Sequence, residues 1–288
     1  MPAPLLRLAF ITPSYFKDFD RCQLLVESFD RYVPRQYHHY VLVPARDEKL
    51  FKPLNSSRTH VVLQEDVLPF WLKHVKRAPK FWLSLRSMPV RGWIIQQLVK
   101  LNACAAIDAD AFACIDSGCF FVQPFDPLAV HYRDGKLLLF REQGPQFLTK
   151  DVSAWHAVSE KLLGTPHLDK PDRSYVSLVV YFWRHVLRAL QNHIEAVHGT
   201  DWRVPIVRQR TFSEYFLYGA FCDDLLKESA NQYRDDRLFA HCHWGTVPLG
   251  AEGLRKMKAE MPSERVLVMI NEKSGTPLEL IREIFFGL

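Results

Sequence analysis

Short apolar runs separated by polar segments dominate the first half of the chain. These runs predict buried strands at residues 5–12, 40–43, 60–63 and 111–115. Between the first two runs, Cys22, Val26 and Phe29 recur at helical spacing, so residues 18–32 predict a helix. Because strands alternate with helices, the pattern predicts an α/β fold with a mostly parallel central sheet and helices on both faces.

Two segments before the fourth run combine polar and aromatic side chains. Residues 66–91 are irregular and contain three prolines, which predicts either an ordered loop over a site or a small subdomain. Residues 92–106 predict the clearest helix, with one continuous apolar face. The opposite face is either a plain solvated surface or a surface turned toward a ligand, and it carries Trp93, Gln96, Gln97 and Lys100. The indole favours a ligand, because a large apolar ring is seldom left in water without a partner.

The second half of the chain continues with the same alternation. Apolar patterns predict strands at 136–140, 175–182 and 266–270 and helices at 152–163 and 183–197. His241 and His243 are two residues apart, so on a strand they share a face. The sequence contains no repeat and no low-complexity linker. We therefore predict a single domain over residues 1–288, whose halves are residues 1–125 and residues 126–288 with a C-terminal helix.

Composition narrows the class of protein. With 48% hydrophobic and 24% charged residues the chain has the composition of an ordinary globular protein. The net charge of +5 suits an anionic small molecule or an acidic membrane surface and is too weak to indicate a nucleic-acid partner. Six cysteines without a C-x-x-C pair predict reduced, buried thiols in a reducing compartment.

Location follows from the absence of targeting patterns. The first residues show no signal peptide, and the longest uncharged apolar stretch, 175–183, is far shorter than the roughly 20 residues that span a bilayer. We therefore expect a cytoplasmic protein. The amphipathic segment 278–288 predicts a helix that packs either on its own domain or on a partner or membrane surface. Contact with a membrane would place the protein peripherally on the inner face of that membrane.

The segment after the fourth run carries the main candidate chemistry. Asp116 ends a buried strand and is followed by Ser117 and Gly118. An ionised carboxylate in that position is unfavourable unless a cation or backbone donors compensate it. Because ligands bind at the carboxyl ends of strands in open α/β sheets, Asp116 is placed where a metal-bound phosphate would sit. The alternative is that Asp-Ser-Gly is simply a good turn between two strands.

Taken together, five segments resemble a family of bacterial glycosyltransferase-like proteins with the GT-A fold. They are FITPSY (10–15), YVLVP (40–44), GWIIQQLVKL (92–101), CIDSG (114–118) and FSEYFLYG (212–219), within a match from about residue 8 to residue 243. The resemblance implies a nucleotide diphosphate sugar donor held across the ends of a parallel sheet. It also implies a divalent cation, Mn²⁺ or Mg²⁺, that bridges the donor diphosphate to an Asp-x-Asp motif. On this basis residues 1–125 form the nucleotide-sugar-binding half and residues 126–288 the acceptor-side half.

The Asp-x-Asp motif is incomplete in this chain. Asp116 matches its first carboxylate, but Gly118 occupies the position of the second. Mg²⁺ and Mn²⁺ often use one or two carboxylates together with phosphate oxygens and water, so one carboxylate does not exclude a metal. The family implies a late histidine ligand, for which His243, or else His241, is the candidate; the alternative is a histidine engaged in ordinary hydrogen bonds.

The remaining donor-side candidates are polar residues at strand ends and on the polar helix face. They are Thr12, Pro13, Ser14, Asp47, Gln97, Lys100 and Ser117. The first three end the first strand, where the GT-A fold meets the nucleoside, and Asp47 follows the second strand as an acceptor for ribose or base. Lys100 is either a phosphate ligand or an ordinary surface lysine. A second Asp-x-Asp, at residues 108–110, precedes its strand, so we interpret it as a solvated helix-to-strand turn.

Glu214 is the sharpest candidate on the acceptor side. Inverting glycosyl transfer needs a carboxylate to take the proton of the acceptor hydroxyl. The alternative is that Thr211 and Glu214 form a capping box at a helix N-terminus. With Asp116 as the second catalytic carboxylate, we expect a glycosyltransferase of the hexosyltransferase type, acting on a glycan or lipid-linked acceptor in cell-surface polysaccharide synthesis.

Two other functions compete with this expectation. The first is a non-catalytic protein that binds nucleotide sugars or glycans and has lost the second motif carboxylate. The second is a nucleotidyltransferase, which uses similar sheets and metals. The chain lacks the glycine-rich, lysine-bearing loop of nucleotidyltransferases after its first strand, where it reads TPSYFK (12–17).

Overall fold

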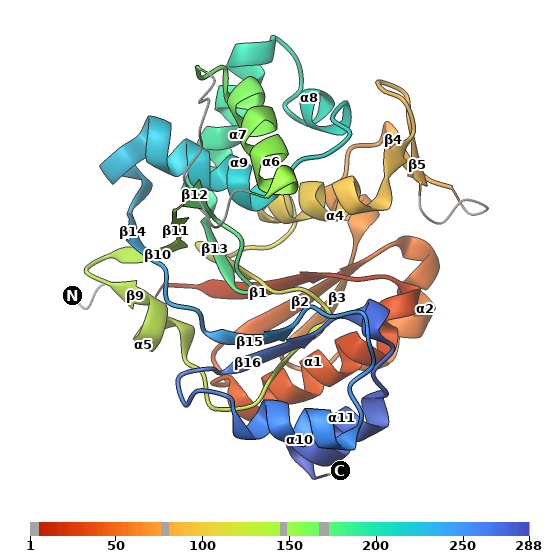
Figure 1. Ribbon diagram of the computed structural model, residues 1–288. Helices are drawn as coiled ribbons and strands as arrows, with labels where there is room; N and C mark the ends of the chain where they lie inside the picture. Colours follow the sequence, from red (N-terminus) through yellow and green to blue (C-terminus); the bar gives the residue numbers. More distant parts are fainter. Residues whose placement is uncertain (1–5, 76–80, 145–148, 167–172, 288) are drawn as a thin grey trace.

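A five-stranded sheet lies at the centre of the computed structural model, which describes residues 6–75, 81–144, 149–166 and 173–287 (Figure 1). In sheet order its strands are β13 (Val180–Trp183), β7 (Ala111–Cys114), β1 (Leu8–Pro13), β2 (His38–Val43) and β3 (Thr59–Leu63). The strands β7, β1, β2 and β3 are parallel, and β13 is antiparallel to β7. The predicted α/β fold with a parallel-rich sheet is therefore confirmed.

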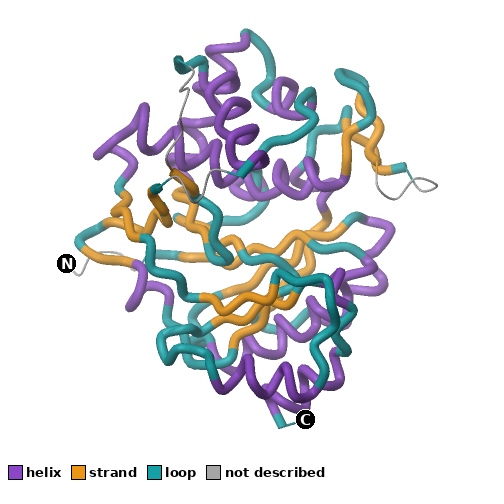
Figure 2. Tube along the Cα trace, in the orientation of Figure 1, coloured by secondary structure: helices purple, strands orange, loops and turns teal. Residues whose placement is uncertain are grey.

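Helices cover both faces of this sheet (Figures 1 and 2). On one face lies α1 (Phe19–Tyr32), and on the other lie α4 (Gly92–Leu101), α7 (Arg184–His198) and α9 (Glu214–Ala220). Because both faces are covered, every residue of β1 and β7 is buried. The other α-helices in the described residues are α2 (Glu48–Phe51), α3 (Gln64–Val67), α5 (Pro127–His131), α6 (Lys150–Leu163), α8 (Arg203–Val207), α10 (Ala251–Ala259) and α11 (Leu278–Phe286).

The helix α1 shows how local sequence sets these elements. Its buried positions include Cys22, Val26 and Phe29, the apolar stripe that predicted a helix at 18–32. The helix ends at Tyr32, two residues before Pro34, because a residue that precedes proline is pushed out of the helical region. The stripe packs inward, where the rings of Phe10 and Phe29 meet edge to face at a centroid distance of 5.0 Å.

Smaller sheets surround the central one. Within residues 66–91, expected as an ordered loop or a small subdomain, lies a sheet of β4 (Leu72–His74), β5 (Phe81–Ser84) and β6 (Val90–Arg91), which favours the second alternative. Another joins β8 (Cys119–Phe121) to β15 (Ala240–His243) and β16 (Leu267–Ile270). The remaining pairings involve β9 (Tyr132–Arg133), β10 (Lys136–Phe140) and β14 (Gln232–Asp235), and also β11 (Glu142–Gln143) with β12 (Arg173–Ser174).

Elements of the second half agree with most of their predictions. The strand at 136–140, the helices at 152–163 and 183–197, and the late strand at 266–270 match β10, α6, α7 and β16 within a few residues. The strand predicted at 175–182 is shorter and begins only at Val180. Because β13 joins the edge of β7, the second half of the chain contributes to the central sheet.

The C-terminal helix packs on its own domain. Ile281 and Phe285 of α11 are buried in an apolar cluster with Phe120, Leu254 and Val268. This is the first of the two alternatives predicted for residues 278–288. No helix among the described residues is long and apolar enough to cross a membrane. All six cysteines are free and all but the half-buried Cys242 are buried, as the cysteine pattern predicted.

Candidate functional site

The candidate site lies at the carboxyl edge of the central sheet. The chain passes from β1 to β2 and β3 on one side, and β7 then adds to β1 on the other side. The strand order therefore reverses between β1 and β7, which is where ligands bind in open α/β sheets. Ser14 follows β1 at this edge and Asp116 follows β7 closely, so the sequence prediction for Asp116 agrees with the topology.

Asp116 belongs to a cluster centred on the ammonium of Lys100. Lys100 Nζ lies 2.8 Å from Asp116 Oδ1, 2.9 Å from Glu214 Oε1 and 2.8 Å from the hydroxyl oxygen of Tyr215. The side chains of Lys100 and Glu214 are 6% and 4% exposed, whereas that of Asp116 is 55% exposed. Asp116 is thus the member of the cluster that is open to solvent, and Lys100 supplies the cation that its position requires.

Two helices position the buried members of the cluster. Lys100 lies in the last turn of α4, and Glu214 is the first residue of α9. The backbone N–H of Glu214 donates to Gln97 Oε1 at 3.0 Å, which fastens the start of α9 to α4. The cap of α9 is Ser213, so the capping box predicted with Thr211 is wrong; the hydroxyl of Thr211 instead accepts a hydrogen bond from Trp155 Nε1.

Burial and charge oppose each other in this cluster. Burial alone would lower the pKa of Lys100, but the carboxylates of Asp116 and Glu214 raise it well above its usual value. Burial raises the pKa of Glu214, and the neighbouring ammonium counteracts part of that rise. Burial, followed by the charge of Asp116, raises the pKa of Tyr215 well above its usual value, so this phenol stays protonated. The cluster therefore contains a permanent cation near one exposed carboxylate.

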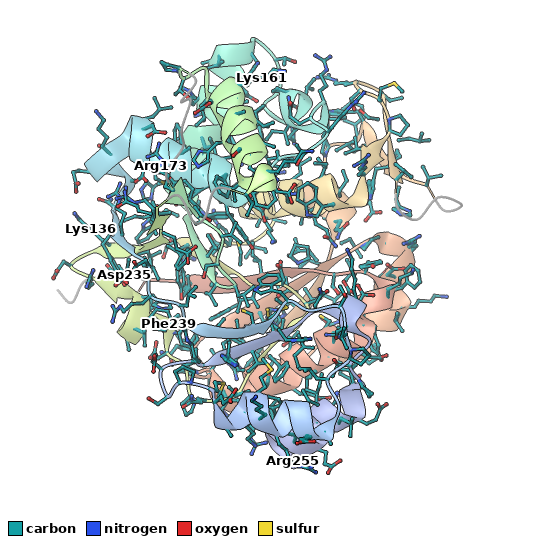
Figure 3. All side chains as sticks on the ribbon, viewed as in Figure 1. Lys136, Lys161, Arg173, Asp235, Phe239 and Arg255 are labelled. Atoms are coloured by element: carbon teal, nitrogen blue, oxygen red, sulfur yellow. The ribbon has the colours of Figure 1, made fainter. Side chains whose placement is uncertain are left out.

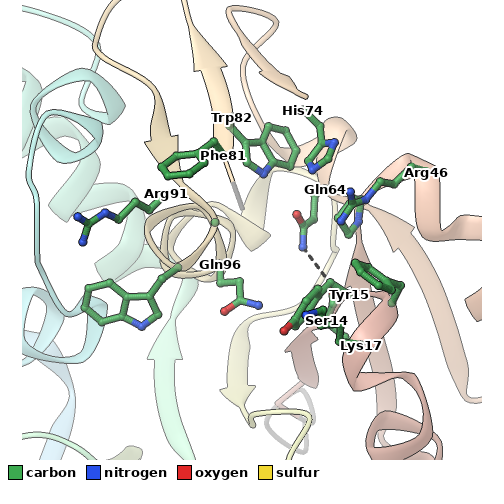
Figure 4. A pocket seen from close by; sticks show the side chains of 14 residues that line it. Ser14, Tyr15, Lys17, Arg46, Gln64, His74, Phe81, Trp82, Arg91 and Gln96 are labelled. Carbon is green, nitrogen blue, oxygen red and sulfur yellow. Dashed lines mark hydrogen bonds between the residues drawn. The ribbon is translucent and has the colours of Figure 1, made fainter. Parts of the chain in front are cut away.

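A cavity of about 560 Å³, here called the strand-edge cavity, opens at the ends of β1, β2 and β3 (Figure 4). Its polar lining includes Ser14, Gln64 and Arg46, and Gln64 Nε2 donates to backbone carbonyls that include that of Leu42 at 3.0 Å. Basic and aromatic side chains also line it: Tyr15, Phe16, Lys17, His74, Phe81, Trp82, Arg91 and Trp93. Figure 4 shows Gln96 and Arg46 on opposite sides of this space.

Arg46 is the best-placed cation of the strand-edge cavity. Its guanidinium lies 5.2 Å from the ring centroid of Phe16, and its Nε is 3.3 Å from Asp47 Oδ1. Its Nη2 atom is buried and has no hydrogen-bond partner among the described residues. A buried guanidinium N–H without a partner is unfavourable, so a phosphate oxygen in this cavity would satisfy it.

The structure separates the predicted donor-side residues. Of these, only Ser14 lines the strand-edge cavity in the described part of the chain. Thr12 is buried with its hydroxyl 2.8 Å from His39 Nε2, and Pro13 is buried at the end of β1. Asp47 is also buried, and its Oδ2 accepts the backbone N–H of Phe16 at 3.0 Å. These residues shape the sheet edge without facing the cavity.

The polar face of α4 divides into two parts. Gln97 and Lys100 are buried against α9, so the prediction of a plain solvated face is wrong for them. Trp93 and Gln96, one turn earlier, line the strand-edge cavity as a ligand-facing surface would. Lys100 is therefore not an ordinary surface lysine. It contacts two carboxylates and does not line the strand-edge cavity.

Ser117 and Gly118 follow Asp116 at the carboxyl edge of the central sheet. Ser117 Oγ donates to Asp18 Oδ2 at 3.2 Å. Burial and then the charge of Glu272 raise the pKa of Asp18 to about 6. A Cβ built on Gly118 would meet no atom within 4 Å, so the missing second carboxylate of the motif is not excluded by crowding.

The described residues offer little to a protein-bound metal ion. No group of three His, Cys, Asp or Glu side chains among them is arranged to hold a metal. His243 lies on β15 with Nε2 3.2 Å from the carbonyl oxygen of Val247. Asp116 already has an ammonium against one of its oxygens. These donors fit a resident divalent cation poorly. The second Asp-x-Asp, at residues 108–110, precedes β7, and both of its carboxylates form ion pairs with Arg7, as expected for a turn.

A second cavity, of about 590 Å³, lies beside the amino end of β13 and near β15. Trp155, Ser177, His241 and Trp244 line it, together with Arg265. Trp155 lies 6.4 Å, between ring centroids, from Trp93 of the strand-edge cavity. The two indoles therefore bring the two cavities next to each other.

Sequence reasoning missed most of the strand-edge cavity. Gln64 directly follows β3, so the rule that selected Thr12 and Asp116 would also have selected it. Arg46 follows β2 and sits next to Asp47, which was selected instead. Trp82 and His74 reach the cavity from the β4–β5–β6 sheet, and no sequence signal assigns that sheet to this edge.

Residues 6–261, most of the chain, match the model of a family of unknown function, DUF6492. The chain belongs to this family. A search of curated proteins finds no match to the chain. The cluster around Lys100 and nearly all residues of both cavities lie within the matched range. Because the family has no known function, the function must be inferred from the chemistry of the site.

Proposed function

We propose that the chain is a GT-A-type glycosyltransferase that moves a sugar from a nucleotide diphosphate sugar to a glycan or lipid-linked acceptor. The observation that carries this proposal is the strand-edge cavity at the carboxyl ends of β1, β2 and β3, on the same edge of a parallel-rich sheet as Asp116. Its volume of about 560 Å³ lies within the range of small-molecule sites. The resemblance of five sequence segments to GT-A enzymes supports the same proposal.

The lining of the strand-edge cavity suits a nucleoside diphosphate. Aromatic rings such as Tyr15 and Trp93 offer surfaces on which a base stacks. The cations Lys17 and Arg46 lie at the same edge and would bind the diphosphate, with the unpartnered Nη2 of Arg46 as its strongest contact. These cations would stabilise the charge that develops on the leaving diphosphate during transfer.

In the proposed transfer an acceptor hydroxyl oxygen forms a bond to C1 of the donor sugar. The bond from C1 to the diphosphate oxygen breaks, and its electron pair leaves with the diphosphate. Asp116 is the exposed carboxylate of the cluster, and we assign it the hydroxyl proton. Neither carboxylate lines a cavity, but Glu214 is buried against Lys100 whereas Asp116 is exposed, so in this proposal the base role predicted for Glu214 passes to Asp116. Glu214 then holds the ammonium in place.

The second cavity would hold the acceptor. Trp155 and Trp244 offer flat apolar faces for sugar rings, and His241 and Ser177 offer hydrogen-bonding groups. The contact between Trp93 and Trp155 places this cavity next to the donor, as transfer between two substrates requires. An acceptor of cell-surface polysaccharide synthesis, either a glycan or a lipid-linked sugar, fits such a surface.

Dependence on Mn²⁺ or Mg²⁺ stays a prediction from the resemblance. Because the protein supplies one exposed carboxylate, a cation there would take most of its ligands from the donor diphosphate and water. The variant Gly118→Asp tests this directly, since the space around Gly118 is open. We expect it to bind nucleoside diphosphates more tightly with Mn²⁺ than without it. Equal binding with and without Mn²⁺ in this variant would argue against a metal at this edge.

Thermal unfolding with nucleoside diphosphates tests the donor site. A ligand at one hundred times its Kd adds about 2.7 kcal/mol to the stability of the native state, which gives a shift of several degrees in Tm. We expect Arg46→Gln and Trp93→Ala to lose most of this shift. Arg255→Gln is the matched control, because Arg255 is exposed on α10, far from this edge (Figure 3). No shift with any nucleoside diphosphate would refute the donor site.

Turnover separates the enzyme from its rivals. A glycosyltransferase releases nucleoside diphosphate from the donor sugar, and Asp116→Asn should remove this release while the thermal shift remains. A non-catalytic binding protein would show the shift without release in the wild type. A nucleotidyltransferase would instead release pyrophosphate from a nucleoside triphosphate and a sugar phosphate.

A further inference from the structure

The β4–β5–β6 sheet carries apolar side chains on its outer face. Leu72 pairs with Ser84 and Trp82 with Val90, and Leu72, Trp82 and Val90 of this inner face are buried. On the outer face, Phe81 and Leu83 of β5 are exposed. Figure 1 shows the β4–β5 hairpin projecting from the upper right of the molecule, beyond α4. One sheet therefore has apolar residues on both of its faces.

The exposed apolar residues extend beyond the strand. Their exposed fractions are large, at 77% for Phe70, 55% for Leu83, 81% for Leu85 and 82% for Met88. Sheets with one face in water normally alternate apolar and polar residues, with the polar ones outward. Clustered apolar side chains on an outer face mark a surface that is covered when the protein works.

Positive charge surrounds this apolar face. Lys73 pairs with Leu83 and Arg91 pairs with Phe81 on the same outer face, and Arg86 follows β5. Between Asp66 and Asp108 the sequence contains no Asp or Glu, so no acidic side chain of this segment offsets the charges of Lys73, Arg86 and Arg91. Such a distribution repels a basic partner and attracts an anionic surface.

A basic groove of about 660 Å³ lies next to the hairpin and extends the positive surface. Met88 and Arg91 line it from the hairpin side, and Arg208 and Arg210 line it after α8. None of these three arginines forms an ion pair with a carboxylate in the part of the chain that the structure describes. Arg208 Nε and Nη2 donate to the backbone carbonyl of Arg86 at 3.4 and 3.3 Å, so its Nη1 and the guanidinium groups of Arg91 and Arg210 are the donors left for phosphate oxygens.

We propose that this face, the outer side of the β4–β5–β6 sheet with the groove of Arg208 and Arg210, docks on the surface of an anionic lipid bilayer. Leu83, Leu85 and Met88 would enter the interface between headgroups and acyl chains, and the arginines would bind lipid phosphates. The combination of apolar side chains and unpaired cations selects a bilayer, because a purely ionic partner would leave the apolar side chains in water.

Docking through this face would orient the strand-edge cavity. Phe81 and Arg91 line both that cavity and the basic groove, so a docked protein would hold the cavity close to the membrane. This orientation deepens the proposed function, since it would present a lipid-linked acceptor to the donor. Docking itself does not rest on sugar transfer, and a binding experiment without any nucleotide sugar tests it separately.

The test is co-sedimentation of the full chain with vesicles. One set contains phosphatidylcholine with about one-third phosphatidylglycerol, and the other phosphatidylcholine alone. We expect binding to the anionic vesicles only, and its loss at high salt. The double variant Leu83→Ser/Leu85→Ser should bind at least about tenfold more weakly. The double variant Arg208→Gln/Arg210→Gln should bind about thirtyfold more weakly, from about 1 kcal/mol for each arginine.

Matched controls change exposed residues of the same kind elsewhere. Val130→Ser/Val247→Ser removes exposed apolar side chains, and Lys161→Gln/Arg255→Gln removes exposed cations at the places shown in Figure 3. Both controls should bind as the wild type does. Absence of binding to anionic vesicles, or equal weakening in the control variants, would overturn the proposal. Concentration-dependent dimers that Leu83→Ser/Leu85→Ser abolishes, without vesicle binding, would also overturn it and assign the face to a second copy of the chain.

Discussion

Replacing Lys100 by methionine removes the ammonium at the centre of the cluster and keeps most of the side-chain volume. Glu214 then loses its partner at 2.9 Å and stays buried, whereas Asp116 remains half exposed to solvent. Breaking a buried ion pair by removing one member typically costs about 3–5 kcal/mol, because the remaining charge is uncompensated. We expect Lys100→Met to lower the free energy of unfolding by this amount near pH 8.

The loss should depend on pH with a definite sign. Burial raises the pKa of Glu214, and without Lys100 only the backbone N–H of Glu214 still counteracts that rise. A carboxyl group whose folded pKa is raised contributes stability at low pH and loses it as the pH rises. The deficit of Lys100→Met relative to the wild type should therefore be smaller at pH 5 than at pH 8. The double variant Lys100→Met/Glu214→Gln, which has no buried charge, should recover most of the stability.

Urea denaturation measures these differences from the midpoint, provided that the slope m is unchanged. Lys136→Met is the matched control, because it breaks a pair of similar length, 2.9 Å to Glu228, that lies on the surface (Figure 3). That change should cost no more than about 1 kcal/mol. The reasoning is refuted if Lys100→Met costs as little as this control, or if Glu214→Gln does not restore the double variant.

Two further predictions concern single residues. Burial and the charge of Glu272 raise the pKa of Asp18 from 3.8 to about 6, so the wild type loses stability as the pH rises through this window. Asp18→Asn should therefore be more stable than the wild type at pH 8, by up to about 3 kcal/mol, and equal to it near pH 3.5. Urea midpoints measure both differences. A gap that persists unchanged at the lower pH would show that charge is not the cause. A Cβ on Gly219 would lie 2.4 Å from the ring of Tyr175, so Gly219→Ala should lower stability by about 1–3 kcal/mol in thermal unfolding, whereas Gly118→Ala, in open space, should lower it far less. Equal effects at the two glycines would contradict the packing argument.

Hydrophobic periodicity was sufficient to predict the central sheet. The strands β1 and β7 are almost continuous apolar runs, since both of their faces are covered by helices. The strands β2 and β3 begin with polar residues and end as apolar runs. The carboxyl-edge rule also predicted the place of Asp116, which follows β7 by two residues, whereas its role in binding or catalysis stays a prediction. The prediction worked where one physical cause, burial, determines both the residue type and its place.

The lining of the strand-edge cavity could not be predicted in the same way. Trp82 and His74 come from the small β4–β5–β6 sheet, whose position depends on tertiary contacts that sequence patterns do not encode. Lys100 was also misleading, because helical spacing places it on a polar face and says nothing of a second helix that covers that face. Buried ion pairs form between distant residues, here 114 positions apart, and local patterns do not reveal them.

The ammonium of Lys100 has three N–H bonds and three oxygen partners, since it donates to Asp116 and Tyr215 and is ion-paired with Glu214. This lysine is therefore saturated. A phosphate can accept a hydrogen bond from Lys100 only if it displaces one of the carboxylates or the phenol from the ammonium. Recognition of substrate phosphates then begins with other cations, and direct engagement of Lys100 would displace Asp116 or break one of the two contacts of the lysine with the start of α9.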